Sequence, residues 1–247
     1  MLLAGHTEPR DRLIVALDVP TRDEAQGLID QLDGTVSFFK VGFQLLLAEG
    51  MAFVRDLVDQ DKRVFLDLKM DDVDETIIQG VREISRVHVH FLTIHGNGAT
   101  ARAAVTGRDG SDFPKILSLT LLSSLDQQDL VDLEIVGKGR KFTNLRDYVL
   151  WRGGQAIDAG CDGLIASGDS IAHLRGRLGD ETIIVSPGIR PKGISSDDHK
   201  RFTTPRNAIR DGADYLVVGR PIRNAANPGD MARAIVDEIE QGLTVHV

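Results

Sequence analysis

Charged residues that end an apolar run are the residues of this sequence best suited to chemistry. Residues 63–76 read RVFLDLKMDDVDET, so Asp67 and Lys69 follow a run of large apolar side chains. On an extended strand, residues two apart point to the same face, and the carboxylate and the ammonium are expected side by side. Charges at the end of a buried strand are costly to desolvate unless they are paired or functional. The segment is therefore either a solvated strand end with a stray ion pair or a preorganised charged site.

A second lysine and a further carboxylate extend this pair. Lys40 stands near the end of the apolar run 36–41, and Asp72 follows Lys69 by three residues. Alternating lysines and carboxylates keep one another charged, because each opposite charge favours the ionised form of its neighbour. Such an array needs no reorientation when charge develops on a substrate. We predict that Lys40, Asp67, Lys69 and Asp72 are catalytic.

Eight short apolar runs alternate with helical patterns along the chain. Near-continuous apolar strands are typical of a parallel sheet that helices cover on both sides. Eight such units in 247 residues predict an α/β protein with a (β/α)8 TIM barrel, in which residues 1–247 form one catalytic domain. The predicted strands are residues 13–17, 36–41, 63–68, 89–94, 115–119, 163–166, 182–185 and 215–218. The predicted helices are residues 21–32, 43–59, 75–86, 99–106, 170–178 and 228–241.

A doubly wound sheet is the alternative fold. It would usually show fewer strands and a glycine-rich first turn, whereas the first turn here reads ALDVPT. The longest stretch without a pattern, residues 123–143, is predicted to be an extended loop after the fifth strand.

Polar residues occupy the ends of the predicted strands. In a TIM barrel the active site lies at the carboxyl ends of the strands, so these residues are candidates for the site. They are Asp18, Lys40, Asp67, Lys69, His95, Thr120, Ser167 and Arg220.

Two glycine-containing loops fit the place where TIM barrels often bind phosphate. Residues 186–193 read SPGIRPKG after the seventh strand, and residues 219–222 read GRPI after the eighth. Glycine lets the backbone approach an anion, and arginine offers paired donors to phosphate oxygens. The alternative is that these residues only make turns and that the arginines are solvated. We predict a phosphate site formed by both loops.

Composition restricts the partners and the compartment. The net charge of −8 argues against nucleic acid as the main partner. Cys161 is the only cysteine, so no intrachain disulfide can form, and a reducing cytoplasmic location is expected. No apolar stretch approaches the ~20 residues of a membrane span, and the N-terminal segment is too charged for a signal peptide. No metal-ligand motif is present, so no metal site is expected.

Five segments together resemble the orotidine 5′-monophosphate decarboxylase family, and the resemblance covers nearly the whole chain. They are ALDVPTRDEA (16–25), FKVG (39–42), FLDLKMDDV (65–73), SPGIRPKG (186–193) and DYLVVGRPI (214–222). The D-x-K-x-x-D pattern is only moderately specific alone, but it is highly specific when combined with FKVG and both phosphate loops. The resemblance implies cofactor-independent conversion of orotidine 5′-monophosphate to uridine 5′-monophosphate in pyrimidine biosynthesis. It also implies a homodimer with shared active sites.

The resemblance implies roles for the residues of the array. Asp67 would lie against the substrate carboxylate, and Lys69 would protonate C6 as carbon dioxide leaves. Lys40 would complete the array and touch the ribose. Asp18 would hydrogen-bond a ribose hydroxyl.

Further contacts follow from the same resemblance. Asp72 and Thr76 would cross a dimer interface into the neighbouring chain's site, and Ser123 would lie against the pyrimidine. The 5′-phosphate would be held by residues of the two loops after the seventh and eighth strands: Pro187, Gly188, Arg190, Lys192, Gly219 and Arg220.

The sequence departs from the family pattern in two places. The motif is usually followed by Ile-Pro, whereas this chain has Val73 and Asp74, so a rigid turn residue is replaced by a charge. A glutamine common in the phosphate loop is replaced by Lys192, which could pair with phosphate as a point charge.

Two other functions are compatible with a phosphate-binding barrel. The first is a magnesium-dependent sister enzyme, 3-keto-L-gulonate-6-phosphate decarboxylase or hexulose-6-phosphate synthase. Those enzymes generally carry a glutamate in place of Lys40, and a lysine does not suit a hard cation. The second is a non-catalytic phosphate-binding barrel, which would be expected to have lost Lys69 or its charged partners.

Overall fold

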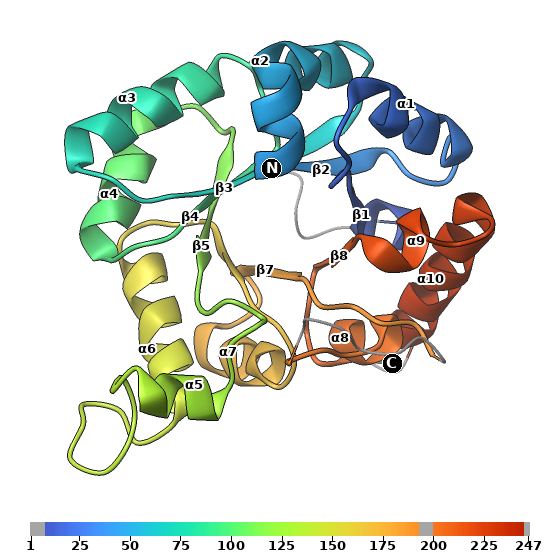
Figure 1. The fold of residues 1–247 in the computed structure, drawn as a ribbon. Helices are drawn as coiled ribbons and strands as arrows, with labels where there is room; N and C mark the ends of the chain where they lie inside the picture. Colours follow the sequence, from blue (N-terminus) through green and yellow to red (C-terminus); the bar gives the residue numbers. More distant parts are fainter. Residues whose placement is uncertain (1–7, 193–199, 245–247) are drawn as a thin grey trace.

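The computed structural model describes residues 8–192 and 200–244, and its centre is a closed barrel (Figure 1). Eight parallel strands follow one another in chain order, and β1 pairs with β8 to close the barrel. This confirms the predicted (β/α)8 TIM barrel of the α/β class. Gly193 of the predicted phosphate loop, and the first seven residues of the N-terminal segment, lie outside the described residues. The strands are β1 (Leu13–Ala16), β2 (Phe38–Gly42), β3 (Arg63–Met70), β4 (Phe91–Ile94), β5 (Lys115–Leu119), β6 (Gly163–Ile165), β7 (Ile183–Ser186) and β8 (Tyr215–Val218).

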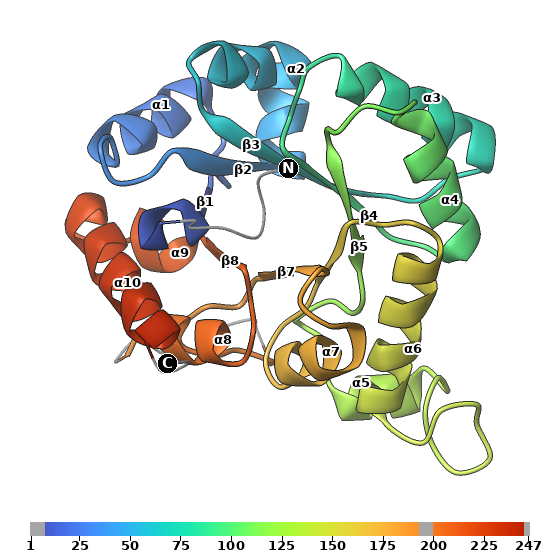
Figure 2. The same cartoon turned by 180° about the vertical axis from the view of Figure 1, so that it is seen from behind.

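Helices surround the barrel, as Figure 1 and the view from behind in Figure 2 show. A short 3-10 helix, η1 (Pro9–Arg12), precedes β1 and contacts β1, β8 and α10. Within residues 8–192 and 200–244, no helix is long and apolar enough to cross a membrane. The helices are α1 (Arg22–Gln31), α2 (Phe43–Asp59), α3 (Asp74–Ser85), α4 (Gly98–Gly107), α5 (Gln127–Asp132), α6 (Leu145–Asp158), α7 (Ser170–Leu178), α8 (Pro205–Arg210), α9 (Arg220–Arg223) and α10 (Pro228–Leu243).

The inward-facing side chains of β2 and β3 are apolar at the start of each strand and charged at its end. In β2 the inward row runs from Phe38 to Lys40, and in β3 it runs from Phe65 to Asp67. Because alternate residues of a strand face the same side, the rings fill the barrel and the charged groups emerge at its carboxyl end. The inner apolar cluster consists of Ile14, Ala16, Phe38, Phe65, Phe91, Leu117, Leu119, Ile165, Ile183, Val185, Tyr215 and Val217.

Four α-helices, α5, α6, α8 and the four-residue α9, lie where the sequence analysis places none. α5 falls inside residues 123–143, which we expected to be an extended loop, and an aspartate capping box begins it. α6 contains Gly153, a residue type that lowers helix propensity. A Cβ at Gly153 would come within 2.7 Å of a Leu174 side-chain carbon, so close packing on α7 requires the glycine. α8 is only six residues long, too short for a clear helical period.

Candidate active site

A cavity of about 1140 Å³ opens at the carboxyl ends of the strands. It contains most of the residues that the sequence analysis predicts for the site, although they come from distant parts of the chain. The barrel brings them together because every strand ends at the same rim. The predicted residues that line the cavity are Asp18, Lys40, Asp67, Lys69, Ser123, Pro187, Gly188, Arg190, Gly219 and Arg220.

Four of these side chains form a row of alternating charge. Lys40 Nζ lies 2.9 Å from an Asp18 carboxylate oxygen and 3.5 Å from an Asp67 oxygen. Lys69 Nζ lies 2.8 Å from the other Asp67 oxygen. Lys40 is only 8% exposed, so its charge is stabilised mainly by the two carboxylates. Three members of the predicted array, Lys40, Asp67 and Lys69, therefore lie together, and within the chain Asp18 rather than Asp72 is the fourth.

Gly42 leaves room for the first ion pair of this row. A Cβ at this position would lie 3.0 Å from Lys40 Nζ and 3.2 Å from an Asp18 oxygen. Any larger side chain would have to displace one of the two charged groups. The glycine of FKVG is thus part of the way in which the strand positions its lysine.

The backbone around Lys69 is not the regular strand that we predicted. Between Leu66 and Met70 the pairing of β3 with β4 shifts register, and Lys69 has a φ of 47°. This irregularity still directs the Lys69 ammonium onto Asp67. Thr93 on β4 holds this irregular backbone in place, because its hydroxyl accepts a hydrogen bond from the Lys69 N–H (3.0 Å) and donates one to Asp67 (2.8 Å).

Asp67 is held in its charged form. Burial alone would raise the pKa of this carboxyl, because a charge is less stable away from water. The positive charges of Lys40 and Lys69, and hydrogen bonds from Lys69 and Thr93, outweigh burial and lower the pKa below its ordinary value. The carboxylate is thus ionised at neutral pH and points into the cavity.

Asp72 and Thr76 lie apart from the array of their own chain. Both are exposed, and neither is among the residues that line the cavity. Asp72 accepts a hydrogen bond from the Val73 N–H at 2.7 Å. Asp74 is the first residue of α3, a position where proline is common and where a negative charge interacts well with the helix dipole. The departure from the family's proline at this position therefore keeps a favourable helix start.

The loop after β7 contributes Pro187, Gly188 and Arg190 to the cavity lining. Gly188 has a φ of 74°, a conformation that glycine adopts without strain. The N–H of Arg190 donates to the Thr203 carbonyl at 2.9 Å, and the N–H of Thr203 donates to the Gly188 carbonyl at 3.2 Å. Lys192 is exposed and does not line the cavity.

Comparison with known proteins assigns the chain to a family. A sequence profile described as the orotidine 5′-phosphate decarboxylase / HUMPS family matches residues 11–235. The chain belongs to this family. The orotidine 5′-phosphate decarboxylase of Rhodopseudomonas palustris (strain HaA2) is 47% identical over 232 residues, which are 94% of this chain and 96% of the relative. That of Methylobacterium sp. (strain 4-46) is 44% identical over 236 residues, which are 94% of this chain and 97% of the relative.

A solved structure shows the same likeness. The crystal structure of orotidine 5′-phosphate decarboxylase from Lactobacillus acidophilus matches with a TM-score of 0.78 and 30% identity, covering 92% of this chain and 98% of that one. The chain is therefore a carboxy-lyase of the orotidine 5′-phosphate decarboxylase / HUMPS family. The names of these relatives favour decarboxylation over the magnesium-dependent sugar-phosphate reactions considered above.

Three strand-end candidates of this family member lie outside the cavity lining. Thr120 is buried and donates to the Ile165 carbonyl at 2.9 Å, and Ser167 is buried as well. Burial, and then the charge of Arg152, lower the pKa of His95. The four residues of the charged row, in contrast, all line the cavity.

Three functional candidates escape the sequence analysis. Thr93 is visible only as a polar residue within the apolar run of the fourth strand. Arg223 lines the cavity and donates to the Asp18 carbonyl, but its place in the GRPIR sequence resembles any solvated arginine. Arg201 contacts the loop that carries Ser123, and no local pattern marks it.

Proposed function

We propose that the protein decarboxylates orotidine 5′-monophosphate to uridine 5′-monophosphate without a cofactor, as a step of pyrimidine biosynthesis. The observation that carries this proposal is the row of Asp18, Lys40, Asp67 and Lys69 in one cavity with two phosphate-type loops. Residues 1–247 would act as one catalytic domain in the cytoplasm, with a small nucleotide as partner and neither nucleic acid nor membrane. Charge neutralisation at one end and anion binding at the other match the two ends of this nucleotide.

The array suits a reaction that leaves negative charge on carbon. When the bond from C6 to the carboxyl carbon breaks, its electron pair stays on C6, which has no neighbouring electron sink. The Lys69 ammonium, fixed by Asp67, stabilises this charge and gives a proton to C6. Lys69 then regains a proton from water. Asp67 occupies the place beside the substrate carboxylate, and Lys40 keeps Asp67 ionised.

Binding contacts far from C6 supply the rest of the reduction in the reaction barrier. Asp18 and Lys40 bind the ribose hydroxyls, and Ser123 contacts the pyrimidine from the loop after β5. Interactions with remote parts of a substrate can lower the barrier when they position the reacting atoms. The 5′-phosphate is bound by residues at the far end of the cavity: Pro187, Gly188, Arg190, Gly219 and Arg220, with Lys192 nearby.

A homodimer would complete the site. Asp72 and Thr76 are exposed at the start of α3, and Val73 between them is 68% exposed. At the start of α2, Phe43 is 55% exposed and Leu47 is 82% exposed. Large apolar side chains that face water favour a contact with another protein surface. We infer that a second copy covers them and that Asp72 and Thr76 reach its ribose site.

The metal-dependent alternative fits the geometry less well. The Lys40 ammonium lies between the Asp18 and Asp67 carboxylates, where a divalent cation would need both as ligands. A divalent cation bound there would lie beside the Lys40 ammonium, and the two positive charges would repel each other.

Absorbance-monitored decarboxylation of purified protein tests the proposal. We expect turnover of orotidine 5′-monophosphate that is unchanged by EDTA. Loss of turnover with EDTA would favour the metal-dependent sister enzymes. Tight binding of uridine 5′-monophosphate without turnover of the substrate would instead favour a non-catalytic phosphate-binding barrel.

A further inference from the structure

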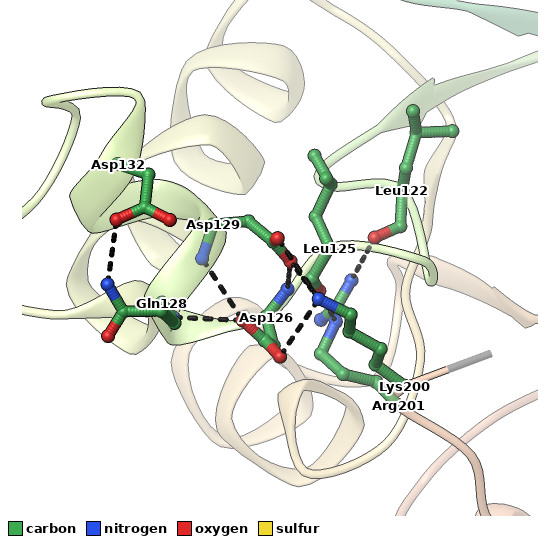
Figure 3. A network of polar contacts seen from close by, with 8 residues as sticks. All are labelled: Leu122, Leu125, Asp126, Gln128, Asp129, Asp132, Lys200 and Arg201. Carbon is green, nitrogen blue, oxygen red and sulfur yellow. Dashed lines mark hydrogen bonds and ion pairs between the residues drawn. The ribbon is translucent and has the colours of Figure 1, made fainter. Parts of the chain in front are cut away.

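Arg201, which lies between β7 and α8, bonds to the loop after β5 (Figure 3). Its guanidinium donates to the carbonyls of Leu121 (3.0 Å), Leu122 (3.1 Å) and Leu125 (3.0 Å). Its backbone N–H donates to the carbonyl of Ser123 at 3.2 Å. These acceptors lie on both sides of Ser123 as well as on it, so one residue fixes the whole turn after β5.

This arginine is held by backbone rather than by a carboxylate. Among residues 8–192 and 200–244, no acidic side chain forms an ion pair with Arg201. Its remaining contacts are the Ser170 hydroxyl (3.1 Å) and the Ser167 carbonyl (3.5 Å) at the start of α7. Burial lowers the pKa of Arg201 to about 10, which still leaves it charged at neutral pH. Burying part of a cation that bonds only to neutral groups costs folding free energy. The presence of Arg201 here therefore favours a role for the geometry of its bonds.

The neighbouring residue strengthens the same junction. Lys200 Nζ lies 3.3 Å from Asp126 and 2.8 Å from Asp129, the two residues that form the capping box of α5. Figure 3 shows the side chains of Lys200 and Arg201, which are neighbours in the sequence, reaching the loop after β5 and the start of α5. The pair Lys200 and Arg201 therefore ties the β7 loop to the β5 loop at several points.

A short path leads from this junction to the phosphate loop. Thr203, two residues after Arg201, pairs with Gly188 and Arg190 through two backbone hydrogen bonds. It also forms an isolated parallel bridge with Ile189. Gly188, Arg190 and Ser123 all line the cavity. In the proposed function the first two bind the phosphate and Ser123 contacts the pyrimidine.

We propose that Arg201 is a positioning residue that couples the phosphate end of the site to the pyrimidine end. The proposal rests on the proposed function and extends it, because Arg201 does not line the cavity. When phosphate fixes Gly188 and Arg190, the Thr203 pairing fixes Arg201, which in turn fixes the Ser123 turn. The phosphate thereby contributes to placing the ring as well as to holding the substrate.

The consequence is a loss that depends on the substrate's phosphate. Arg201→Ala should lower kcat/KM for orotidine 5′-monophosphate about 100-fold, mainly in kcat. For orotidine, which lacks the phosphate, the loss of kcat/KM should be less than about fivefold, because no bound phosphate helps to position the Ser123 turn. The kcat/KM of Arg201→Lys should fall between those of the unchanged protein and Arg201→Ala, because one ammonium cannot reach acceptors on both sides of Ser123.

Arg175→Ala is the matched control. Arg175 also bonds to backbone carbonyls, those of Gly179 (2.6 Å), Thr182 (2.9 Å) and Gly212 (2.8 Å), but these lie where β7 and β8 begin. Unlike Arg201, it also forms an ion pair, with Asp214 at 2.7 Å. Its removal should lower Tm without changing the ratio of kcat/KM between orotidine 5′-monophosphate and orotidine. Arg201→Ala should instead lower this ratio at least about tenfold.

The experiment measures both substrates with excess enzyme in single turnovers, for the unchanged protein and all three variants. A fall of the ratio in Arg201→Ala and Arg201→Lys, but not in Arg175→Ala, supports the coupling. Equal losses for both substrates would show a purely structural role and overturn it, and Arg201→Lys decides the matter if Arg201→Ala does not fold. The unchanged protein tests the proposed function separately, because absence of its turnover would refute that function. In that case the same ratio is read from the affinities for uridine 5′-monophosphate and uridine.

Discussion

Lys69 Nζ lies 2.8 Å from Asp67 Oδ1 even though the Lys69 backbone, with a φ of 47°, has left the extended conformation. A non-glycine residue in this region stores strain of about 1 kcal/mol or more, which the surroundings must offset. Thr93 does so by bonding both to the Lys69 backbone and to the Asp67 carboxylate. The lysine is therefore aimed by a distortion of the strand that a neighbouring strand maintains.

Thr93→Val should uncouple this arrangement while preserving the shape of the side chain. The partly buried Lys69 N–H would lose its acceptor, which should cost about 1–3 kcal/mol of unfolding free energy. Loss of the hydrogen bond to Asp67 should raise the pKa of that carboxyl and lower kcat about 10- to 100-fold. Steady-state kinetics and urea unfolding measure both effects. Thr93→Ser keeps the hydroxyl and should stay close to the unchanged protein; equal damage by Ser and Val would argue against the hydrogen bonds.

Shared active sites predict rescue between inactive variants. Asp72→Asn and Lys69→Ala should each have little activity as homodimers, because each lacks one part of every site. After subunit exchange, a mixed dimer should contain one site with both residues intact. We expect mixing to restore up to about a quarter of the unchanged activity, since half of the dimers are mixed and each has one complete site. Exchange demonstrated by mass spectrometry without any recovery of turnover would contradict the sharing.

The barrel and most of the cavity lining could be predicted from sequence because their signals are local. Apolar runs of strand length mark β5 (Lys115–Leu119) and β8 (Tyr215–Val218), whose observed bounds match the prediction. The carboxyl ends of the strands then place Lys40 and Asp67 at one rim.

The remainder depends on contacts between distant segments. The bend at Lys69 depends on the register between β3 and β4, which no single run of residues specifies. Asp18 is predicted as a ribose ligand, and only the closed barrel shows that it also pairs with Lys40. The contacts of Arg201 span about 80 residues of sequence, so no local pattern could reveal them.

His90 should make stability fall as the solution becomes acidic. Burial, and then the charge of Arg63, lower the pKa of His90 to about 4, while an unfolded histidine has its ordinary pKa near 6.5. Between these values the unfolded chain binds a proton that the folded chain does not, so stability is present above pH ~6.5 and is lost down to pH ~4. The loss should be about 1–3 kcal/mol.

Substitution by phenylalanine tests this origin of the acid sensitivity. His90 packs against Phe38 and Phe113, with ring centroids 5.6 and 5.0 Å away, so His90→Phe should be accommodated. Urea unfolding across this pH range should show a smaller slope for His90→Phe. His88→Asn, at an exposed position with a φ of 60°, should keep the full slope. An unchanged slope in His90→Phe would assign the acid sensitivity to other groups.

The rate at which Lys69→Ala decarboxylates orotidine 5′-monophosphate tests the central claim most directly, because the account gives the fixed Lys69 ammonium both charge stabilisation and proton transfer. Removal should lower kcat by at least about 10⁴-fold, the combined size of the two effects. Thermal unfolding and binding of uridine 5′-monophosphate should show that the variant is folded and that its phosphate end is intact. Turnover within about tenfold of the unchanged protein would contradict the role of Lys69 and with it the proposed mechanism.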